Sequence, residues 1–547
     1  MSFWRLGMGV RHTTPSSARK RYYKKRLKRT GVLVALALIL ALVVCGSLAD
    51  PVLAPDSDTD LGLLSPHTPL PLASATPEVE PTAVVTAEVT PEQKPRLTVA
   101  LPTQGQLIPP SEDTQILYYT IAGDSLPMVS VRFGVDAGEI TSPDPINHQG
   151  LISPGQLLII PNRLGETSSS SKLLPDSEVT FSPSTVEFDT QAYLEGAGGY
   201  LAEYTQYLAS TGWTTGADII DRIAMEYSIN PRLLLAFLEF QSGWVYGSPA
   251  PETDTSYPMG YVNDNSKGLY KQCAWFASAV MDGYYGWREG RMLAIDFMDG
   301  QSLRLAPQLN AGTVGLMHAF TKLYEIEAWG QSLYGDQSLF VLFDSMFGDP
   351  WIRAQDVEPL IPADTVQPEM ILPFELNRRW TLTGGPHAAW SATDVWAAID
   401  FAPGTSAPGC EESNAWVVAA MPGLVVRSGN GVVVIDMDGD GYEQTGWTLL
   451  YLHIATKDRI EEGEWVEVGD RIGHPSCEGG RSTGTHVHIA RRYNGEWVPA
   501  DGPLPFTLSG WEAKAGNDPY KGWLIRGNEI VYANISGGQQ SQIVREE

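Results

Sequence analysis

Five of the nine histidines of the chain lie between residues 387 and 488, and they are His387, His453, His474, His486 and His488. The segments 423–438 and 447–455 alternate apolar and polar residues between Gly-rich turns, which predicts β-strands. One residue separates the last two histidines, in the run Gly-Thr-His-Val-His. Side chains at i and i+2 of a strand project from the same face, so His486 and His488 are expected to act together, on a metal or in proton transfer.

A carboxylate and a further histidine belong to two other expected strands. Asp400 stands in the run Ile-Asp-Phe-Ala-Pro, and His453 ends the run Tyr-Leu-His. Together with the His-x-His run and the glycine turns at 462–463 and 468–473, these motifs resemble the lysostaphin-type, LytM-like zinc metallopeptidases. The resemblance spans roughly residues 380–495. It implies an antiparallel β domain that cuts peptide bonds in peptidoglycan.

The first zinc ligand of most such peptidases is a histidine four residues before the aspartate, where this chain has Trp396. A staphylolytic branch of the family takes this ligand from a longer preceding loop, within a Gly-Gly-x-His sequence. Residues 384–387 read Gly-Gly-Pro-His, thirteen residues before Asp400. The resemblance therefore implies that His387, Asp400 and His488 hold zinc, and that Trp396 fills the place that the displaced histidine vacated.

Three protein ligands leave the fourth position of a tetrahedral zinc ion open to water, which is typical of a catalytic site. His453 and His486 then remain available to transfer the proton of that water and to stabilise charge in the transition state. His474 stands in a loop, and we interpret it as a structural or rim residue. Tyr451 shares a strand face with His453, which leaves two interpretations, a cleft residue or a core residue.

A second group of oxygen ligands lies between two expected strands. Asp436, Asp438 and Asp440 occupy positions 1, 3 and 5 of a loop with Gly441 at position 6, which is the spacing of calcium loops. The glutamate expected at position 12 is replaced by Trp447. Two interpretations follow, a calcium site and a solvated acidic hairpin.

The region 187–348 has an apolar period near 3.6, which predicts helices, and Asn230 before Pro231 is expected to cap one of them. This region resembles the lytic transglycosylases, lysozyme-like domains that cut glycan strands. Gln241 stands where that family has its catalytic glutamate, and an amide cannot donate and recover a proton. We therefore expect an all-α domain that has lost catalysis. Aromatic residues such as Trp287 either stack on sugars or form the core.

Another small module is expected before the helices. It begins with a strand at Tyr119, the pair Asp124-Ser125 is expected to cap a helix, and Gly134 suits the end of that helix. With the closing run Leu151–Pro161, residues 114–164 resemble a LysM module, a small α+β domain that binds N-acetylglucosamine polymers such as peptidoglycan.

Charge is distributed very unevenly along the chain. Residues 1–30 carry ten Lys or Arg and no acidic residue, although the whole chain has a net charge of −27. The acidic remainder excludes nucleic acid as a partner, because affinity for phosphates comes from Lys and Arg. Residues 31–49 are apolar and predict a single transmembrane helix, with the basic segment in the cytoplasm and the bulk of the chain at the bacterial cell wall. A cleaved signal peptide is the alternative.

A Pro- and Thr-rich linker is expected over residues 50–113. Cys410 and Cys477 flank the central strands of the C-terminal domain, and in an exported protein we expect them to form a disulfide. Cys273 stands in an apolar helical run and is expected to be a buried free thiol.

The predicted fold class is multidomain: one N-terminal transmembrane helix, a small α+β LysM module, an all-α lysozyme-like domain, an antiparallel β peptidase domain at 370–505, and a C-terminal extension at 506–547. The predicted function is a membrane-anchored peptidoglycan endopeptidase that uses zinc. The alternative is a non-catalytic LytM-like regulator, which binds the wall and activates other wall hydrolases; members of that kind typically lack one of the metal ligands.

Overall fold

The computed structural model describes residues 114–391, 395–404 and 409–547. The predicted basic segment, transmembrane helix and linker, residues 1–113, lie outside these residues. Within the described part, no helix is both long and apolar enough to cross a membrane. The predicted fold class included a transmembrane helix. That part of the prediction is corrected, because the described residues contain no such helix.

The N-terminal module, residues 114–164, is built on a two-stranded antiparallel sheet of β1 (Gln115–Tyr119) and β2 (Leu157–Pro161), with α2 (Leu126–Phe133) between them. Gly134 ends α2 in the left-handed conformation, at φ 68°, where a residue without Cβ is favoured. Ser125 is the N-cap but makes no side-chain capping bond. Asp124 is fully buried instead, and it accepts hydrogen bonds from Tyr118 at 2.6 Å and Arg132 at 2.7 Å.

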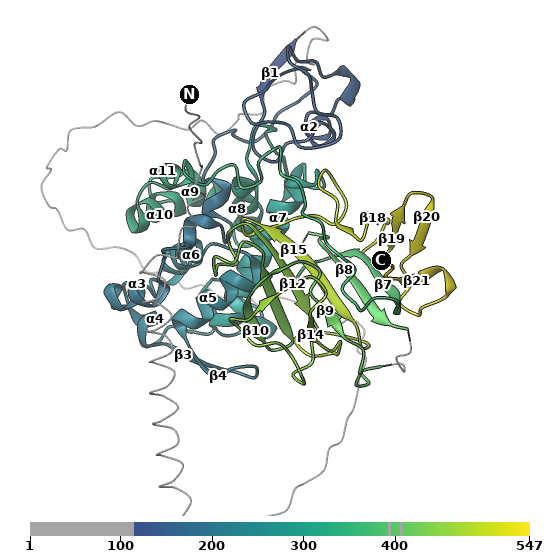
Figure 1. The fold of residues 1–547 in the computed structure, drawn as a ribbon. Helices are drawn as coiled ribbons and strands as arrows, with labels where there is room; N and C mark the ends of the chain where they lie inside the picture. Colours follow the sequence, from purple (N-terminus) through teal and green to yellow (C-terminus); the bar gives the residue numbers. More distant parts are fainter. Residues whose placement is uncertain (1–113, 392–394, 405–408) are drawn as a thin grey trace, which may run out of the picture. The chain divides into compact units, whose positions relative to one another are not determined.

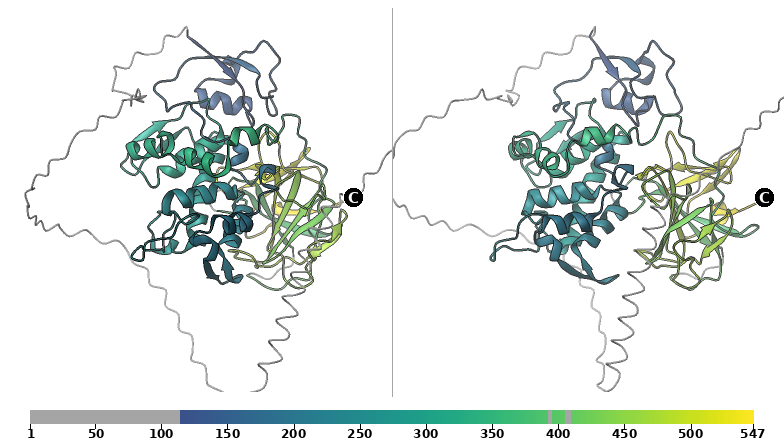
Figure 2. Two further views of the ribbon diagram at one scale, coloured as in Figure 1. Left: turned by 90° about the vertical axis from the view of Figure 1, so that its left-hand side faces the viewer. Right: turned by 60° about the vertical axis from the view of Figure 1, so that its left-hand side comes forward.

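The helical domain follows, and its helices are the blue-green group in Figures 1 and 2. They are α3 (Thr190–Ala197), α4 (Tyr200–Glu203), α5 (Gly216–Tyr227), α6 (Pro231–Ser242), α7 (Leu269–Arg288), α8 (Ala311–Phe320), α9 (Ile326–Tyr334), α10 (Leu339–Phe347) and α11 (Pro350–Ala354). The expected cap of α6 is present, because Asn230 accepts a hydrogen bond from Arg232 N at 2.9 Å. Trp287 is 1% exposed, so it belongs to the core and cannot stack on sugars.

Two short hairpins interrupt the helical domain and correct the all-α prediction. They are β3 (Thr205–Leu208) with β4 (Gly212–Thr215), and β5 (Ala294–Asp296) with β6 (Ser302–Arg304). Thr, Tyr and Trp dominate the first hairpin, and these side chains favour extended backbone. The helical period of the surrounding sequence concealed these strands because each has only three or four residues.

A nine-stranded antiparallel sheet forms the centre of the β domain, residues 370–547. Its main path runs in the order β13, β10, β11, β12, β15, β8, β7 and β21, with β16 paired to β15. The bounds are β7 (Arg379–His387), β8 (Ala398–Pro403), β10 (Gly423–Gly429), β11 (Val432–Asp436), β12 (Trp447–Leu452), β13 (Trp465–Val466), β15 (Val487–Tyr493), β16 (Glu496–Trp497) and β21 (Gln542–Val544). A small second sheet pairs β9 (Val417–Val418) with β14 (Arg471–Gly473).

Both faces of this sheet are buried, and alternate residues enter different cores. Val433, Leu449 and Ile489 belong to a core within the β domain, whereas Leu450 and Ala490 belong to the same core as the helices. The helical domain and the sheet therefore share one continuous apolar core. Neither surface would be stable in water alone, because each buries its apolar side chains against the other.

Buried polar contacts reinforce this interface at the turn between β15 and β16. Arg288 of α7 forms an ion pair with Glu496 at 3.0 Å, and Tyr285 accepts a hydrogen bond from Trp497 N at 2.9 Å. Gly495 is in the left-handed conformation at φ 78°, with no space for a Cβ beside the carbonyl of Phe181. The turn thus fits closely between backbone segments of the helical domain.

The C-terminal extension, 506–547, contains a four-stranded sheet of β17 (Thr507–Leu508), β18 (Trp511–Ala515), β19 (Gly522–Arg526) and β20 (Glu529–Tyr532). Its last strand, β21, pairs with β7 and so joins the main sheet. The extension is therefore part of the β domain rather than an appendage to it.

Candidate metal centre

Three neighbouring strands bring the predicted ligands together. His488 of β15 lies directly opposite Asp400 of β8, and Asp400 lies opposite Gly384 of β7. The register of β7 shifts twice before His387, and these irregularities place His387 opposite Ala398. Bulges of this kind redirect side chains at functional sites. His387 thus ends a strand, whereas the sequence had suggested a loop.

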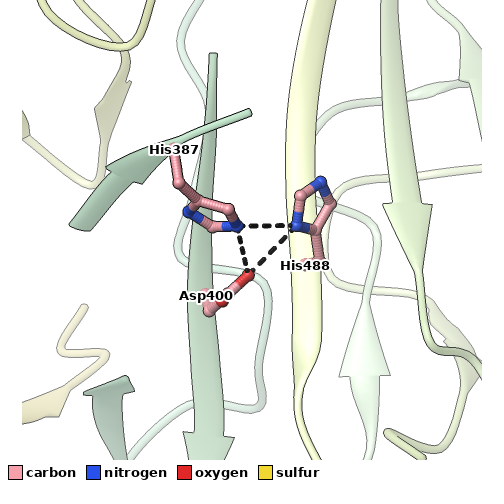
Figure 3. Close-up of side chains that lie close together, drawn as sticks. All are labelled: His387, Asp400 and His488. Carbon is pink, nitrogen blue, oxygen red and sulfur yellow. Dashed lines mark hydrogen bonds and ion pairs between the residues drawn. The ribbon is translucent and has the colours of Figure 1, made fainter. Parts of the chain in front are cut away.

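The three side chains converge on one point, as Figure 3 shows. His387 Nε2 lies 3.3 Å from Asp400 Oδ1 and 3.0 Å from His488 Nδ1. His488 Nδ1 lies 3.1 Å from the same carboxylate oxygen. Asp400 Oδ1 is buried and accepts no hydrogen bond of normal geometry. A buried oxygen without a donor, facing two ring nitrogens, suits a cation in their midst.

The outer ring nitrogens determine which atoms face the centre. His387 Nδ1 lies 2.8 Å from the carbonyl of Gly385, and His488 Nε2 lies 3.0 Å from the carbonyl of Ala389. A carbonyl can only accept, so each outer nitrogen carries the proton, and the inner nitrogen of the neutral ring presents a lone pair. Metal-binding histidines are usually held in this way. The donor set of two imidazoles and one carboxylate therefore fits zinc.

The two glycines before Pro386 are required by the packing around the site. A Cβ at Gly384 would lie 2.6 Å from Asp400 Oδ2, and a Cβ at Gly385 would lie 2.7 Å from the backbone of Lys521. Both distances are far below van der Waals contact. The Gly-Gly-Pro-His motif therefore makes room for the carboxylate on one side and for the C-terminal extension on the other.

The charges of the site favour an ionised Asp400. Burial opposes the charge, but His387 and His488 hold the pKa of Asp400 well below its ordinary value. Burial also lowers the pKa of His387, yet the adjacent carboxylate more than compensates and the pKa of His387 is raised. For His488, burial dominates and the pKa is lowered. At neutral pH the centre thus has an anion and at least one neutral imidazole to offer a cation.

His453 and His486 stand beside the three ligand residues. Their ring centroids are 4.4 Å apart, and His486 Nε2 lies 3.8 Å from Asp400 Oδ2. His453 Nδ1 donates to the carbonyl of Glu478 at 2.8 Å, and His486 Nδ1 donates to the carbonyl of Gly484 at 2.8 Å. In each ring, Nε2 is therefore the basic atom. His453 follows β12 with a positive φ of 67°, an uncommon conformation for a residue with a Cβ. Burial and the neighbouring imidazoles lower the pKa of His453 to about 3.

His474 and Tyr451 lie apart from this group. His474 Nδ1 donates to the carbonyl of Ala415 at 2.8 Å, and its ring packs on Trp416 at 3.9 Å between centroids. Tyr451 is fully buried, and its hydroxyl accepts a hydrogen bond from Ala420 N at 2.7 Å. Tyr451 is therefore a core residue, and the cleft interpretation is wrong.

One residue of the site was missed by sequence reasoning. The ring of Tyr520 stacks on His387, with 4.0 Å between centroids and an angle of 23°. Its backbone carbonyl accepts a hydrogen bond from Gly385 N at 3.0 Å, and its own N–H donates to Pro386 at 3.2 Å. Tyr520 lies in the C-terminal extension, 133 residues beyond His387 in the chain, and no local signal links the two.

The remaining predicted residues lie elsewhere. Cys410 and Cys477 form a disulfide with 5.7 Å between Cα atoms, and Cys273 is a buried free thiol. Gln241 of the helical domain donates a hydrogen bond to the Tyr324 hydroxyl at 2.7 Å. The loop with Asp436 forms the second group of closely spaced ligand atoms in the described residues.

Comparison with known proteins divides the chain into two matched parts. Residues 398–500 match the family described as peptidase family M23, and residues 172–361 match the family described as LasA, N-terminal domain. The first range includes Asp400, His453, His486 and His488 but not His387. The second covers the helical domain and is a different family from the lytic transglycosylases that the sequence suggested.

The match to peptidase family M23 lies within the C-terminal β domain. Protease LasA of Pseudomonas aeruginosa is 24% identical over 383 residues, which cover 65% of this chain and 82% of the relative. A second strain of that species has a protein with 24% identity over 390 residues. Both matches cover 82% of the relative's length.

Among solved structures, the M23 metalloprotease pseudoalterin from the deep sea is 23% identical, with a TM-score of 0.26 over 31% of this chain and 96% of that chain. The catalytic domain of a prophage-encoded M23 protein of Enterococcus faecalis is 26% identical, with a TM-score of 0.17 over 25% of this chain and 95% of that chain.

Proposed function

We propose that this protein is a zinc-dependent peptidase that hydrolyses peptide bonds in the peptides of bacterial cell-wall peptidoglycan. One observation carries the proposal: His387, outside the matched M23 segment, meets Asp400 and His488 with its lone pair turned inward. The ligand set is therefore complete. A non-catalytic relative would be expected to lack one member, so the enzyme is favoured over the regulator.

Each residue of the site is assigned one of two roles, metal binding or proton transfer. His387, Asp400 and His488 would hold a zinc ion, which when bound would acidify a water molecule and polarise the scissile carbonyl. His486 and His453, both with a free Nε2, assist the transfer of a proton from the attacking water to the leaving amine. Burial and the neighbouring imidazoles lower the pKa of His453 to about 3, so its ring is neutral at working pH and can accept a hydrogen bond from the water, whereas His486 is the proposed acceptor of the proton.

The substrate approaches between the two domains. A cavity of about 220 Å³ is lined by Arg222 and Tyr270 of the helical domain, and by Trp390, Arg427 and Asn430 of the β domain. Trp390 follows Ala389, whose carbonyl holds His488. Both arginines are paired with a glutamate, Arg222 with Glu226 and Arg427 with Glu443, each at 2.7 Å, so the lining is polar without an excess of positive charge. The helical domain thus contributes to the cleft, and Gln241 gives it no glycan-cutting chemistry of its own.

The N-terminal module is proposed to be a LysM module that retains the enzyme on the glycan strands. Its order of strand, helix, turn and strand supports this proposal. Binding to glycan through one module raises the effective concentration of the peptidase near its bonds.

Digestion of purified peptidoglycan by the full chain tests the proposed reaction. The full chain is needed because the β15–β16 turn packs into the helical domain, so a C-terminal fragment would expose part of a shared core. New amino groups should appear without new reducing sugar ends, and a chelator should stop their release until zinc is returned.

Two variants make the test specific. His387→Ala should abolish the release of amino groups, whereas His474→Gln, at a histidine outside the centre, should retain it. Release of reducing ends would indicate a glycosidase instead. No release of amino groups by zinc-loaded protein would refute the peptidase and leave the regulator.

A further inference from the structure

The loop between β11 and β12 gathers three carboxylates at the opposite end of β12 from His453. Asp436, Asp438 and Asp440 each offer one oxygen, and these oxygens all lie within 4.8 Å of one another. Asp436 is paired with Thr448 at the start of β12, whereas His453 follows its last residue. The acidic loop is thus separated from the proposed zinc site by the length of a strand.

The carboxylate of Asp436 is fully buried, and only one of its two oxygens accepts a hydrogen bond. Asp436 is 0% exposed, and its Oδ2 accepts a hydrogen bond from Gly441 N at 2.8 Å. Its Oδ1 is buried and accepts none. Within the described part of the chain, no Lys or Arg forms an ion pair with Asp436 or Asp438. Burial and the neighbouring carboxylates of Asp438 and Asp440 raise the pKa of Asp436 to about 7, because an ionised buried oxygen without a donor must be compensated by an opposite charge.

Two arginines contact a later residue of the same loop. Arg427 pairs with Glu443 at 2.7 Å, and Arg492 lies 3.5 Å from the same glutamate. These contacts neutralise Glu443, the eighth residue of the loop, and neither arginine forms an ion pair with Asp436 or Asp438. A bound cation would supply what the arginines do not.

We propose that Asp436, Asp438 and Asp440 bind a calcium ion. The ligands are all oxygen, with no imidazole or thiolate, which favours a hard cation over zinc. Mg²⁺ demands a compact octahedron, whereas Ca²⁺ accepts irregular sets completed by water. The residue at position 12 is Trp447 and cannot supply the usual bidentate carboxylate, so we expect weak binding, with a Kd of roughly 10⁻⁴ to 10⁻³ M, as in extracellular modules.

The ion would stabilise the interface between the domains rather than take part in hydrolysis. Next to the acidic residues, Gly446 N donates to Asn494 Oδ1 at 2.9 Å, and Asn494 Nδ2 donates to the carbonyl of Leu360 at 2.8 Å. Asn494 belongs to the turn that packs into the helical domain. Calcium would therefore connect the β11–β12 loop to the turn on which the shared core depends.

Terbium luminescence with the full chain tests this proposal. Tb³⁺ replaces Ca²⁺ in oxygen sites and emits when a nearby indole is excited, and the ring of Trp465 lies against Gly439 of the loop. We expect sensitised emission that Ca²⁺ displaces. Asp438→Asn and Asp440→Asn should each raise the apparent Kd for Ca²⁺ by about tenfold or more, because affinity follows the number of charged ligands.

Matched variants separate this site from others. Asp400→Asn should retain the calcium-displaceable emission, because it alters only the zinc centre. Asp254→Asn, an exposed residue of the helical domain, controls for the loss of one charge. Because an ion that binds only the folded chain stabilises it, Ca²⁺ should raise the melting temperature. Trp465→Phe should reduce the emission but show the same rise.

The proposal is overturned if Ca²⁺ displaces no emission, or if Asp438→Asn and Asp440→Asn bind Ca²⁺ as tightly as the unaltered chain. It is also overturned if Asp400→Asn abolishes the signal. None of these outcomes depends on peptidase activity, so the calcium site and the proposed function can fail independently.

Discussion

Replacement of Gly384 by alanine adds one methyl group at the most crowded point of the proposed zinc centre. The new Cβ would lie 2.6 Å from Asp400 Oδ2 and 3.0 Å from its Cγ, whereas ordinary contact begins at 3.4 Å. Gly384 and Asp400 are register partners in adjacent strands, so the backbone cannot readily separate them. The carboxylate must therefore retreat by about 0.8 Å to restore contact.

A misplacement of about 1 Å in a catalytic group can cost roughly 100-fold in rate. We therefore expect Gly384→Ala to lower kcat/KM on peptidoglycan peptides by about 100-fold, which corresponds to about 2.7 kcal/mol of transition-state stabilisation. Zinc affinity, measured by competition with a chromophoric chelator, should fall in parallel because Asp400 is one of the proposed ligands. Circular dichroism should show an intact fold.

Gly480→Ala provides the matched control. A Cβ there would lie 3.6 Å from the His453 ring, which is ordinary contact, so activity should stay within a few-fold of the unaltered chain. If Gly384→Ala binds zinc stoichiometrically and retains activity within threefold, then Asp400 does not occupy the position that we assign to it, and the reasoning fails.

Three further predictions concern pH, the disulfide and the domain interface. Zinc affinity should decrease as the pH falls through the pKa of His387, because protons compete with the metal for this ligand. Asp400 raises that pKa above about 6.5 despite burial. Equal affinity at pH 5 and pH 8 would contradict this prediction. The double variant Cys410→Ser/Cys477→Ser should lower the free energy of unfolding, measured in urea, by about 4 kcal/mol, because the disulfide closes a loop over a sequence separation of 67. A loss below about 1 kcal/mol would mean that the disulfide contributes little to stability. Gly495→Ala should lower the free energy of unfolding by at least about 2 kcal/mol more than Gly527→Ala does. Both glycines have positive φ, but only Gly495 abuts the backbone of Phe181. Equal losses in urea denaturation would mean that the turn is not tightly held.

Much of the metal centre could be predicted from the sequence because strand geometry is local. A period of two residues places His486 and His488 on one side whatever the neighbouring strands are, and the Gly-Gly-Pro-His run indicates a displaced ligand. The same local reasoning failed at Asp124, where the expected helix cap proved to be a buried partner of Arg132. A buried ion pair forms only where the surrounding residues exclude water from it, and the short motif at Asp124 does not indicate how deeply that residue is buried.

Domain organisation was less predictable, for a related reason. The sequence suggested separate modules, because composition and periodicity change near residue 370. The structure shows that strands such as β12 are buried on both faces, with Leu449 in one core and Leu450 in the other. An apolar run of this kind indicates burial, but it does not say which surface covers each face.

By itself, the sequence determined which chemical groups are present: two imidazoles and a carboxylate that we propose to bind zinc, two further imidazoles proposed to transfer protons, and three spaced carboxylates proposed to bind a second cation. Only the tertiary structure decided that His387 reaches Asp400, that Tyr520 packs on it from 133 residues away, and that Asp436 has a buried oxygen without a donor. The physical reason is that side-chain spacing is fixed along the backbone, whereas strand order, register and burial are set by contacts between residues far apart in the chain.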